Sequence, residues 1–149
     1  EFNVNGICED AISFLRNNNK KYDVIIAFDV VEHFNKEEIV VLTEYIYNSL
    51  KDAGIFIMRV PYGGSLGGLY IRYSGFTHEV AFTELSIEEL FRTVGFNRII
   101  CIPEPDIHPN LIKSSIKKII NKIIVKALGL PMKDPNFIRS INIIGIGFK

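Results

Sequence analysis

The sequence predicts an α/β protein built on a mostly parallel sheet. Short apolar runs of strand length alternate with segments in which apolar residues recur every three or four positions, as on one face of a helix. Gly, Pro and capping residues separate these segments. Strands that alternate with helices are typical of a parallel sheet covered by helices. A length of 149 residues suits one domain with its own core.

The first half of the chain contains three strand candidates and two helices. Phe2–Cys8 is a weak strand candidate, and Ala11–Asn17 follows as a short helix. Val24–Phe28 is a continuous apolar run, as expected for a strand buried on both faces. Asn35 begins a helix, and Glu38 completes a capping box. The buried stripe of this helix is formed by Ile39, Leu42, Ile46 and Leu50.

A turn at Gly54 and a third strand candidate follow the helix that begins at Asn35. We expect Gly54 to be the left-handed cap that ends the helix. Ile55–Val60 then reads as a strand, and Pro61 stops it. The segment 61–76 is the longest irregular connection before the tail, and long loops that follow strands often carry function.

A second helix–strand unit and a closing strand complete the pattern. Ser86 and Glu89 predict another capping box, and Gly95 ends that helix. Its buried face is expected to contain Ile87, Leu90, Phe91 and Val94. Phe96–Ile102 reads as a strand closed by a proline, and Ile141–Phe148 as the last strand.

Composition narrows the class of protein. Seventeen basic and seventeen acidic residues cancel, so the net charge gives no case for nucleic acid as a partner. The first 103 residues carry 9 Lys/Arg and 14 Asp/Glu, whereas residues 104–149 carry 8 and 3, which indicates a different role for the tail. Cys8 and Cys101 are too few for a disulfide framework and fit a cytoplasmic location.

Four short motifs occur in the chain in a consistent order. Tyr22–His33 reads YDVIIAFDVVEH, and this run resembles the fourth-strand motif of the class I S-adenosylmethionine-dependent methyltransferase family. Leu50–Ile57 is similar to its "LKPGG" turn into the fifth strand, and Glu9–Ala11 to its "GDA" element. Arg72–Thr83 is similar to a segment of the methyltransferases of cell-surface polysaccharide synthesis. The resemblance covers about residues 4–103 and the closing strand.

This resemblance implies a Rossmann-like sheet in a partial methyltransferase domain that spans residues 1–149. It implies a continuous block of four strands with an antiparallel last strand, while the N-terminal strands and the glycine-rich cofactor loop would precede Glu1. The run Gly63–Gly68 does not replace that loop, because it follows a later strand and no helix signal comes directly after it. We interpret it as a mobile substrate loop.

The resemblance also assigns cofactor-binding residues for S-adenosylmethionine. Asp10 and the Ala11 amide would bind adenine, although Asp10 is also suited to cap the short helix. Asp29 would lie near the methionine end as a bare carboxylate, or be a solvated aspartate at the strand end. His33 would line the pocket, or satisfy backbone groups in its turn. Glu32 and His33 are adjacent and have no evident third ligand, so we expect no metal.

The segment before the second helix supplies candidates for the acceptor site. His78 is a candidate catalytic base, because an imidazole can take the proton from an attacking hydroxyl near neutral pH. Arg72, Tyr73 and Glu79 are candidate substrate-binding residues, the first two for sugar hydroxyls or phosphate. The alternative is that Thr77 and His78 only brace the loop through hydrogen bonds.

The basic tail predicts an amphipathic helical insertion at about residues 107–135. Within 111–128, Ile112, Ile116, Ile119, Ile120 and Ile123 share one face, and Lys118, Lys122 and Lys126 lie opposite. Such a helix either lies on an anionic membrane, at the inner face of the cell membrane, or packs its isoleucines on the domain or a partner subunit. Of these two alternatives, we favour packing.

The expected function is methyl transfer from S-adenosylmethionine to a sugar-containing acceptor, either a small molecule or a lipid-linked glycan. The alternative is an inactive fragment that serves as a binding or oligomerisation module, and homo-oligomers fit either reading.

Overall fold

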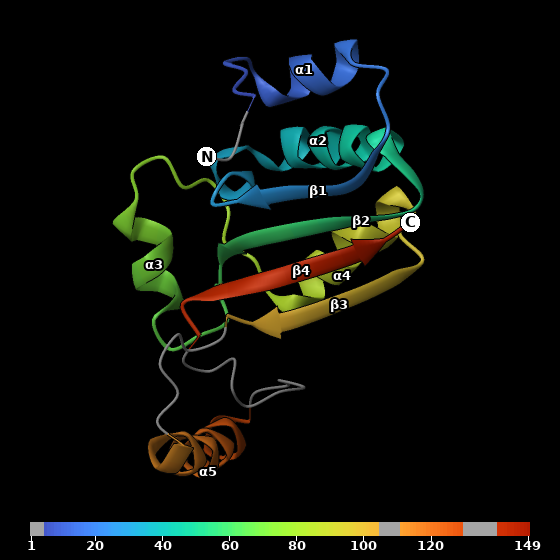
Figure 1. Ribbon diagram of the computed structural model, residues 1–149. Helices are drawn as coiled ribbons and strands as arrows, with labels where there is room; N and C mark the ends of the chain where they lie inside the picture. The colour runs from blue at the N-terminus through green and yellow to red at the C-terminus, as the bar shows by residue number, and fades with distance from the viewer. Residues whose placement is uncertain (1–4, 105–110, 130–139) are drawn as a thin grey trace.

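The computed structural model describes residues 5–104, 111–129 and 140–149, without the side chains of 69, 111–115 and 117. These residues form a four-stranded sheet in the order β1-β2-β4-β3 (Figure 1). β1 (Tyr22–Phe28) and β2 (Leu50–Pro61) are parallel. β4 (Asn142–Phe148) is antiparallel to both β2 and β3 (Arg98–Pro103). The expected block of four strands and its antiparallel last strand are therefore confirmed.

Two helices cover one face of the sheet. α2 (Lys36–Ser49) and α4 (Glu84–Val94) contact each other and the strands, and Figure 1 shows α4 behind β2, β4 and β3. The predicted stripe of α2 is buried, as are Ile87 and Phe91 of α4. The core contains Val31, Ile39, Leu42, Ile46, Leu50, Phe56, Met58, Val60, Tyr62, Phe82, Ile87, Phe91, Phe96 and Ile143.

One capping box is confirmed and the other lies three residues earlier than predicted. Asn35 and Glu38 bond each other's backbone amides at 2.9 and 3.0 Å, as expected. In α4 the box is formed by Thr83 and Ser86, where the Ser86 hydroxyl accepts from the Thr83 amide at 2.9 Å. The prediction of a box at Ser86–Glu89 is wrong, because the threonine hydroxyl already caps the backbone amide of Ser86.

Of the two glycines expected to cap helices, Gly95 does so and Gly54 does not. Gly95 has φ 114° and ends α4, which is confirmed. Gly54 does not end α2, because Leu50 is already extended and donates its amide to the carbonyls of residues 46 and 47. The left-handed residue is Ala53, with φ 61°, inside β2. Gly54 is still required sterically, since a Cβ there would lie 2.8 Å from the Lys51 carbonyl oxygen.

The remaining short elements lie beside the sheet. α1 (Ala11–Asn17) is confirmed and contacts α2. Asn5–Cys8 forms no strand, so that candidate is wrong over its described part, while residues 2–4 lie outside the described residues. The segment 61–76 is not wholly irregular, because α3 (Gly68–Ser74) forms within it at the carboxyl ends of the parallel strands (Figure 1).

The opposite face of the sheet carries exposed apolar side chains. Val24, Ile26 and Phe28 of β1 are 45%, 57% and 48% exposed. Partly buried side chains of the other strands continue this face, because residues paired across strands point the same way. In Figure 1 no described helix lies over it. In the described structure β1 thus packs against the core on one face only, through the partly buried Ile25 and Ala27, contrary to the prediction of burial on both faces.

The tail contains α5 (Leu111–Leu128), and its isoleucine face is exposed. Ile116, Ile119, Ile120 and Ile123 are 53%, 60%, 38% and 62% exposed, so packing of these residues on the domain is not observed. The side chain of Ile112 and the predicted flanks 107–110 and 130–135 lie outside the described residues. Among the described helices, none is both long and apolar enough to cross a membrane.

Candidate functional site

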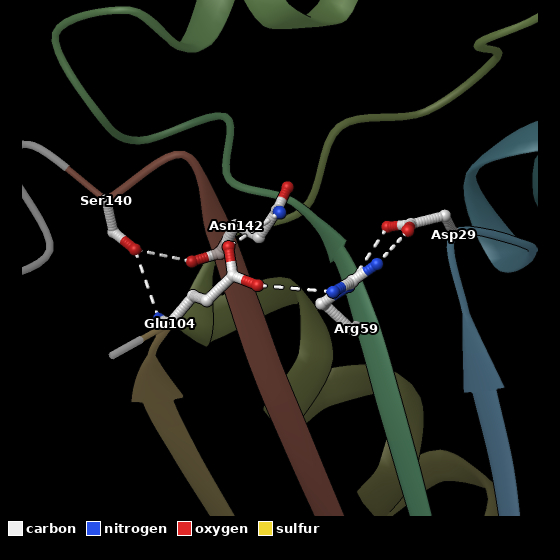
Figure 2. A network of polar contacts seen from close by, with 5 residues as sticks. All are labelled: Asp29, Arg59, Glu104, Ser140 and Asn142. Carbon is white, nitrogen blue, oxygen red and sulfur yellow. Dashed lines mark hydrogen bonds and ion pairs between the residues drawn. The ribbon is translucent and has the colours of Figure 1, made fainter. Parts of the chain in front are cut away.

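A polar network crosses the carboxyl edge of the sheet, where α/β folds bind ligands. Figure 2 shows Arg59 of β2 between two acidic side chains. Its guanidinium pairs with both oxygens of Asp29 and donates to Glu104 at 3.2 Å. Glu104 in turn accepts from the Asn142 amide at 2.8 Å, and its backbone amide donates to the Ser140 hydroxyl at 3.2 Å. The network therefore connects the ends of all four strands.

Asp29 is exposed at the end of β1, as one of its two expected roles requires, but its carboxylate is not bare. Its carboxylate is paired with Arg59, which raises the arginine's already high pKa chiefly through their hydrogen bond. The backbone of Asp29 is left-handed, with φ 54°, which aspartate tolerates better than most residues. Its amide donates to the Arg59 carbonyl at 3.0 Å. The expectation of a bare carboxylate is corrected: this group is neutralised by an adjacent cation.

Directly after Asp29, a 3-10 turn (Val31–His33) begins a second cluster, formed by Glu32, His33 and His78. Ligand atoms of these three side chains all lie within 4.8 Å of one another. The two imidazole rings meet edge to face, with centroids 5.1 Å apart. Nδ1 of His33 lies 3.2 Å from the Thr77 carbonyl oxygen, and Nδ1 of His78 lies 3.3 Å from that of Ile71. We call this group the carboxylate–imidazole cluster.

Glu32 is the buried member of this cluster. Its side chain is 1% exposed, and its Oε2 has no hydrogen-bond partner in the structure. Burial raises the pKa of Glu32 above its usual value, and its own backbone amide and the two imidazoles oppose that rise. The Glu32 carbonyl accepts from the amides of Glu79 and Val80 at 2.8 and 3.3 Å. These two bonds hold the segment that carries His78 against the turn.

Arg72 fixes the same segment from the other side. Its guanidinium donates to the backbone carbonyls of His78 and Glu79. Arg72 is thus engaged in positioning His78, which departs from its expected role as a group that binds sugar hydroxyls or phosphate. Tyr73 is 76% exposed, and Arg72 lies 5.3 Å from its ring centroid. Glu79 has an exposed side chain, so both remain candidates for substrate binding.

Asp10 caps α1, as one of its two predicted roles requires. The Ser13 amide donates to Asp10 Oδ1 at 2.9 Å, and this bond lowers the pKa of Asp10 below its usual value. Ala11 is half-buried against the core. This cap does not bear on the adenine-binding role of Asp10, which stays a prediction.

The run Gly63–Gly68 leads directly into α3, contrary to the expectation that no helix follows it. A Cβ at Gly68 would lie 2.3 Å from the Gly63 carbonyl oxygen, so the close approach of the two backbones needs glycine. Elsewhere, a cavity of about 420 Å³ opens between α2 and α4, lined by residues such as Val40, Ala81 and Leu90. The carboxylate–imidazole cluster is not part of that cavity.

Three solved structures resemble the chain. A SAM-dependent methyltransferase from Archaeoglobus fulgidus aligns with a TM-score of 0.70 at 20% identity, over 96% of this chain and 66% of that protein. A possible histamine N-methyltransferase from Thermotoga maritima gives 0.60 at 14%, over 91% and 61%. The plantazolicin methyltransferase BamL, solved with SAH, gives 0.54 at 14%, over 95% and 58%. The fold is that of SAM-dependent methyltransferases.

This fold confirms the Rossmann-like architecture predicted from the four motifs. At these identities the likeness shows the fold alone. The chain spans less than two thirds of each of the three proteins. No protein-family model matches the sequence, and no curated protein does either.

Sequence reasoning missed two parts of the site. Arg59 was not singled out, although a charged residue within the apolar run Ile-Phe-Ile-Met-Arg-Val is a usable signal. The meeting of His33 with His78 had no such signal, because the two residues are 45 positions apart in the sequence. His78 is the third potential ligand that the pair Glu32–His33 was thought to lack.

Proposed function

We propose that the complete protein transfers a methyl group from S-adenosylmethionine to an oxygen or nitrogen of a sugar-containing acceptor. The observation that carries this proposal is the placement of the carboxylate–imidazole cluster at the carboxyl edge of a methyltransferase fold. The motif at 72–83 supports a sugar-containing acceptor, because it resembles methyltransferases of surface-glycan synthesis. Asp10, Ala11 and His33 are the proposed cofactor contacts.

In methyl transfer, the main task of the protein is to position the acceptor relative to the methyl group. The methyl group leaves a cationic sulfonium, so an acceptor held in line with the sulfur–carbon bond gains much of the acceleration from orientation. His78 is the proposed base that removes the acceptor's proton, because its Nε2 can accept a proton when Nδ1 donates to the Ile71 carbonyl. Asp29 would not contact the cofactor directly in this proposal. Its carboxylate pairs with Arg59, and the two side chains would line the site together.

Turnover by the complete protein tests this proposal. The assay measures S-adenosylhomocysteine formed with a panel of nucleotide sugars and lipid-linked sugars. His78→Ala should lower turnover at least about 100-fold, the usual contribution of a general base, and change affinity for the cofactor little. Arg92→Gln, on the exposed side of α4, is the control. No product with any acceptor despite tight cofactor binding would refute the sugar class, and unchanged turnover in His78→Ala would refute the role of His78.

A second function has an observation in its favour. The exposed face of β1 and its neighbours would suit a binding or oligomerisation module. Sedimentation of the complete protein distinguishes the two: a monomer with turnover supports the enzyme, and an inactive oligomer supports the module.

A further inference from the structure

We propose that Glu32, His33 and His78 form a binding site for a divalent cation of the zinc type. Two imidazoles and one carboxylate are a ligand set that proteins use for zinc with an open fourth position. Zinc lies about 2.0–2.2 Å from such ligands, so atoms that already lie within 4.8 Å of one another need only small side-chain rotations to share one ion. Two nitrogen ligands favour zinc over magnesium or calcium, which prefer oxygen.

The backbone contacts of both imidazoles favour a tautomer that can bind a metal. Nδ1 of His33 and Nδ1 of His78 each face a backbone carbonyl oxygen, which can only accept a hydrogen bond. In the neutral ring, a proton on Nδ1 suits each of these two contacts, and it leaves the lone pair on Nε2. Metal-binding histidines are commonly oriented by this kind of bond from the other ring nitrogen.

The buried carboxylate provides an independent reason for a cation. Glu32 is 1% exposed and its Oε2 has no hydrogen-bond partner in the structure. Buried carboxylates in proteins are paired or coordinate metals, because an isolated one loses its hydration without compensation. The two guanidiniums described near this edge are both engaged elsewhere: Arg59 pairs with Asp29 and Glu104, and Arg72 donates to backbone carbonyls.

The surrounding residues fit the cluster closely. Gly75 packs on the imidazole of His78, and a Cβ there would lie 2.8 Å from Nε2. Arg72 holds the His78 carbonyl, and the Glu32 carbonyl holds the amides of Glu79 and Val80. The three ligands are thus fixed by the backbone of two separate segments, as a preformed metal site requires.

The role of such a cation in the reaction rests on the proposed function. Its open position would hold the acceptor oxygen, whose proton would pass to solvent water, and the oxygen would then attack the methyl carbon as the sulfonium sulfur leaves with the bonding pair. His78 would then act as a ligand rather than as the base.

Zinc binding by the complete protein, stripped with EDTA, tests the site without any methyl transfer. Calorimetry with zinc chloride should show one ion per chain with a Kd on the order of 1 µM or tighter. His78→Ala and Glu32→Gln should each weaken binding at least about 100-fold, and cobalt should give visible absorption bands that both variants lose. If circular dichroism shows that either variant does not fold, His33→Ala replaces that variant in the binding test.

Two matched controls keep the test specific. His108→Ala removes the third histidine of the sequence, and Cys8→Ser removes an exposed thiol that could bind zinc by itself. Both should bind zinc like the parent. Absence of one-equivalent binding, or binding that survives loss of His78 or disappears in Cys8→Ser, would overturn the proposal. Because the readout is calorimetric, it is independent of whether any acceptor is methylated.

Discussion

Asp29 and Arg59 are joined twice across the carboxyl ends of β1 and β2. The backbone amide of Asp29 donates to the Arg59 carbonyl at 3.0 Å, and the Asp29 carboxylate accepts from two nitrogens of the Arg59 guanidinium. The left-handed backbone of Asp29 sends the chain from β1 into the turn that carries Glu32 and His33. One residue thus ends the strand, pairs a cation and begins the candidate site.

The side-chain part of this pair should be measurable. A double-mutant cycle with Asp29→Asn and Arg59→Gln should give a coupling free energy of about 0.5–1 kcal/mol in urea unfolding, because the pair is bidentate but partly exposed. High salt should reduce it. The cycle Asp23→Asn with Lys51→Gln is the control, since those side chains are 81% and 50% exposed, and should give less. Equal coupling in both cycles would contradict this expectation.

Gly95→Ala should destabilise the protein by about 1 kcal/mol or more, because alanine is strained at φ 114°. Thermal or urea unfolding measures the change. Gly6→Ala is the matched control, since no atom lies within 4 Å of the Cβ it would add. Similar stability of the two variants would mean that α4 ends differently in solution.

Arg72→Lys should weaken zinc binding by about 10-fold while leaving the fold intact. A lysine has one donor group in place of the fork that reaches both the His78 and Glu79 carbonyls, so His78 would be held less firmly. Calorimetry with zinc chloride is the measurement. Tyr73→Phe, next in sequence and exposed, should bind zinc normally; an equal loss in both variants would speak against a positioning role for Arg72.

The 149-residue chain alone should bind S-adenosylmethionine poorly. Of the pocket that the sequence resemblance implies, the chain supplies Asp10, Ala11, Asp29 and His33, and Asp29 is already paired with Arg59. We expect no calorimetric signal at cofactor concentrations up to about 1 mM. Micromolar binding by this chain would show that these few contacts are sufficient.

The segment 111–128 should bring the protein to anionic membranes. Exposed isoleucines offer an inserting face, and each lysine can contribute about 1 kcal/mol near an anionic surface. In liposome co-sedimentation, binding should weaken with salt and be lost when three lysines become Glu: Lys118, Lys122 and Lys126. The same charge change at Lys20, Lys21 and Lys36 is the control. If the protein does not bind anionic liposomes at low salt, the membrane prediction is wrong. The exposed isoleucine face would then be expected to bind a partner protein.

Local sequence signals predicted most of the sheet and helices. Val24–Phe28 and Asn35 were placed correctly because continuous apolar runs and capping boxes depend on neighbours in sequence. The prediction for Gly54 was wrong because glycine can be needed either for a positive φ or for a close backbone contact. Gly54 allows a close contact with the Lys51 carbonyl, whereas the positive φ is at Ala53. The box at Ser86 misled because Ser86 is itself the third helical residue of a box that Thr83 begins, with serine where the sequence pattern expects Glu or Gln.

The site was predicted residue by residue but not as an arrangement. His33, His78 and Asp29 were each selected from motifs and strand ends. Their partners depend on tertiary contacts: Arg59 neutralises Asp29, and His78 meets His33 because Arg72 and the Glu32 carbonyl fix the intervening loop. Such pairings follow from the register of the strands and the path of the loop, which no local pattern encodes.

The exposed strand β1 has a consequence for the chain before it is fully folded. Val24–Phe28 is an uncharged run of high β-propensity at the edge of the described sheet, which is the kind of segment that templates aggregation. Asp23 and Asp29 bracket it with negative charge, as gatekeeper residues do around strands that cannot be made polar. We therefore expect the carboxylate that pairs with Arg59 in the native protein to disfavour self-association of the chain before it folds.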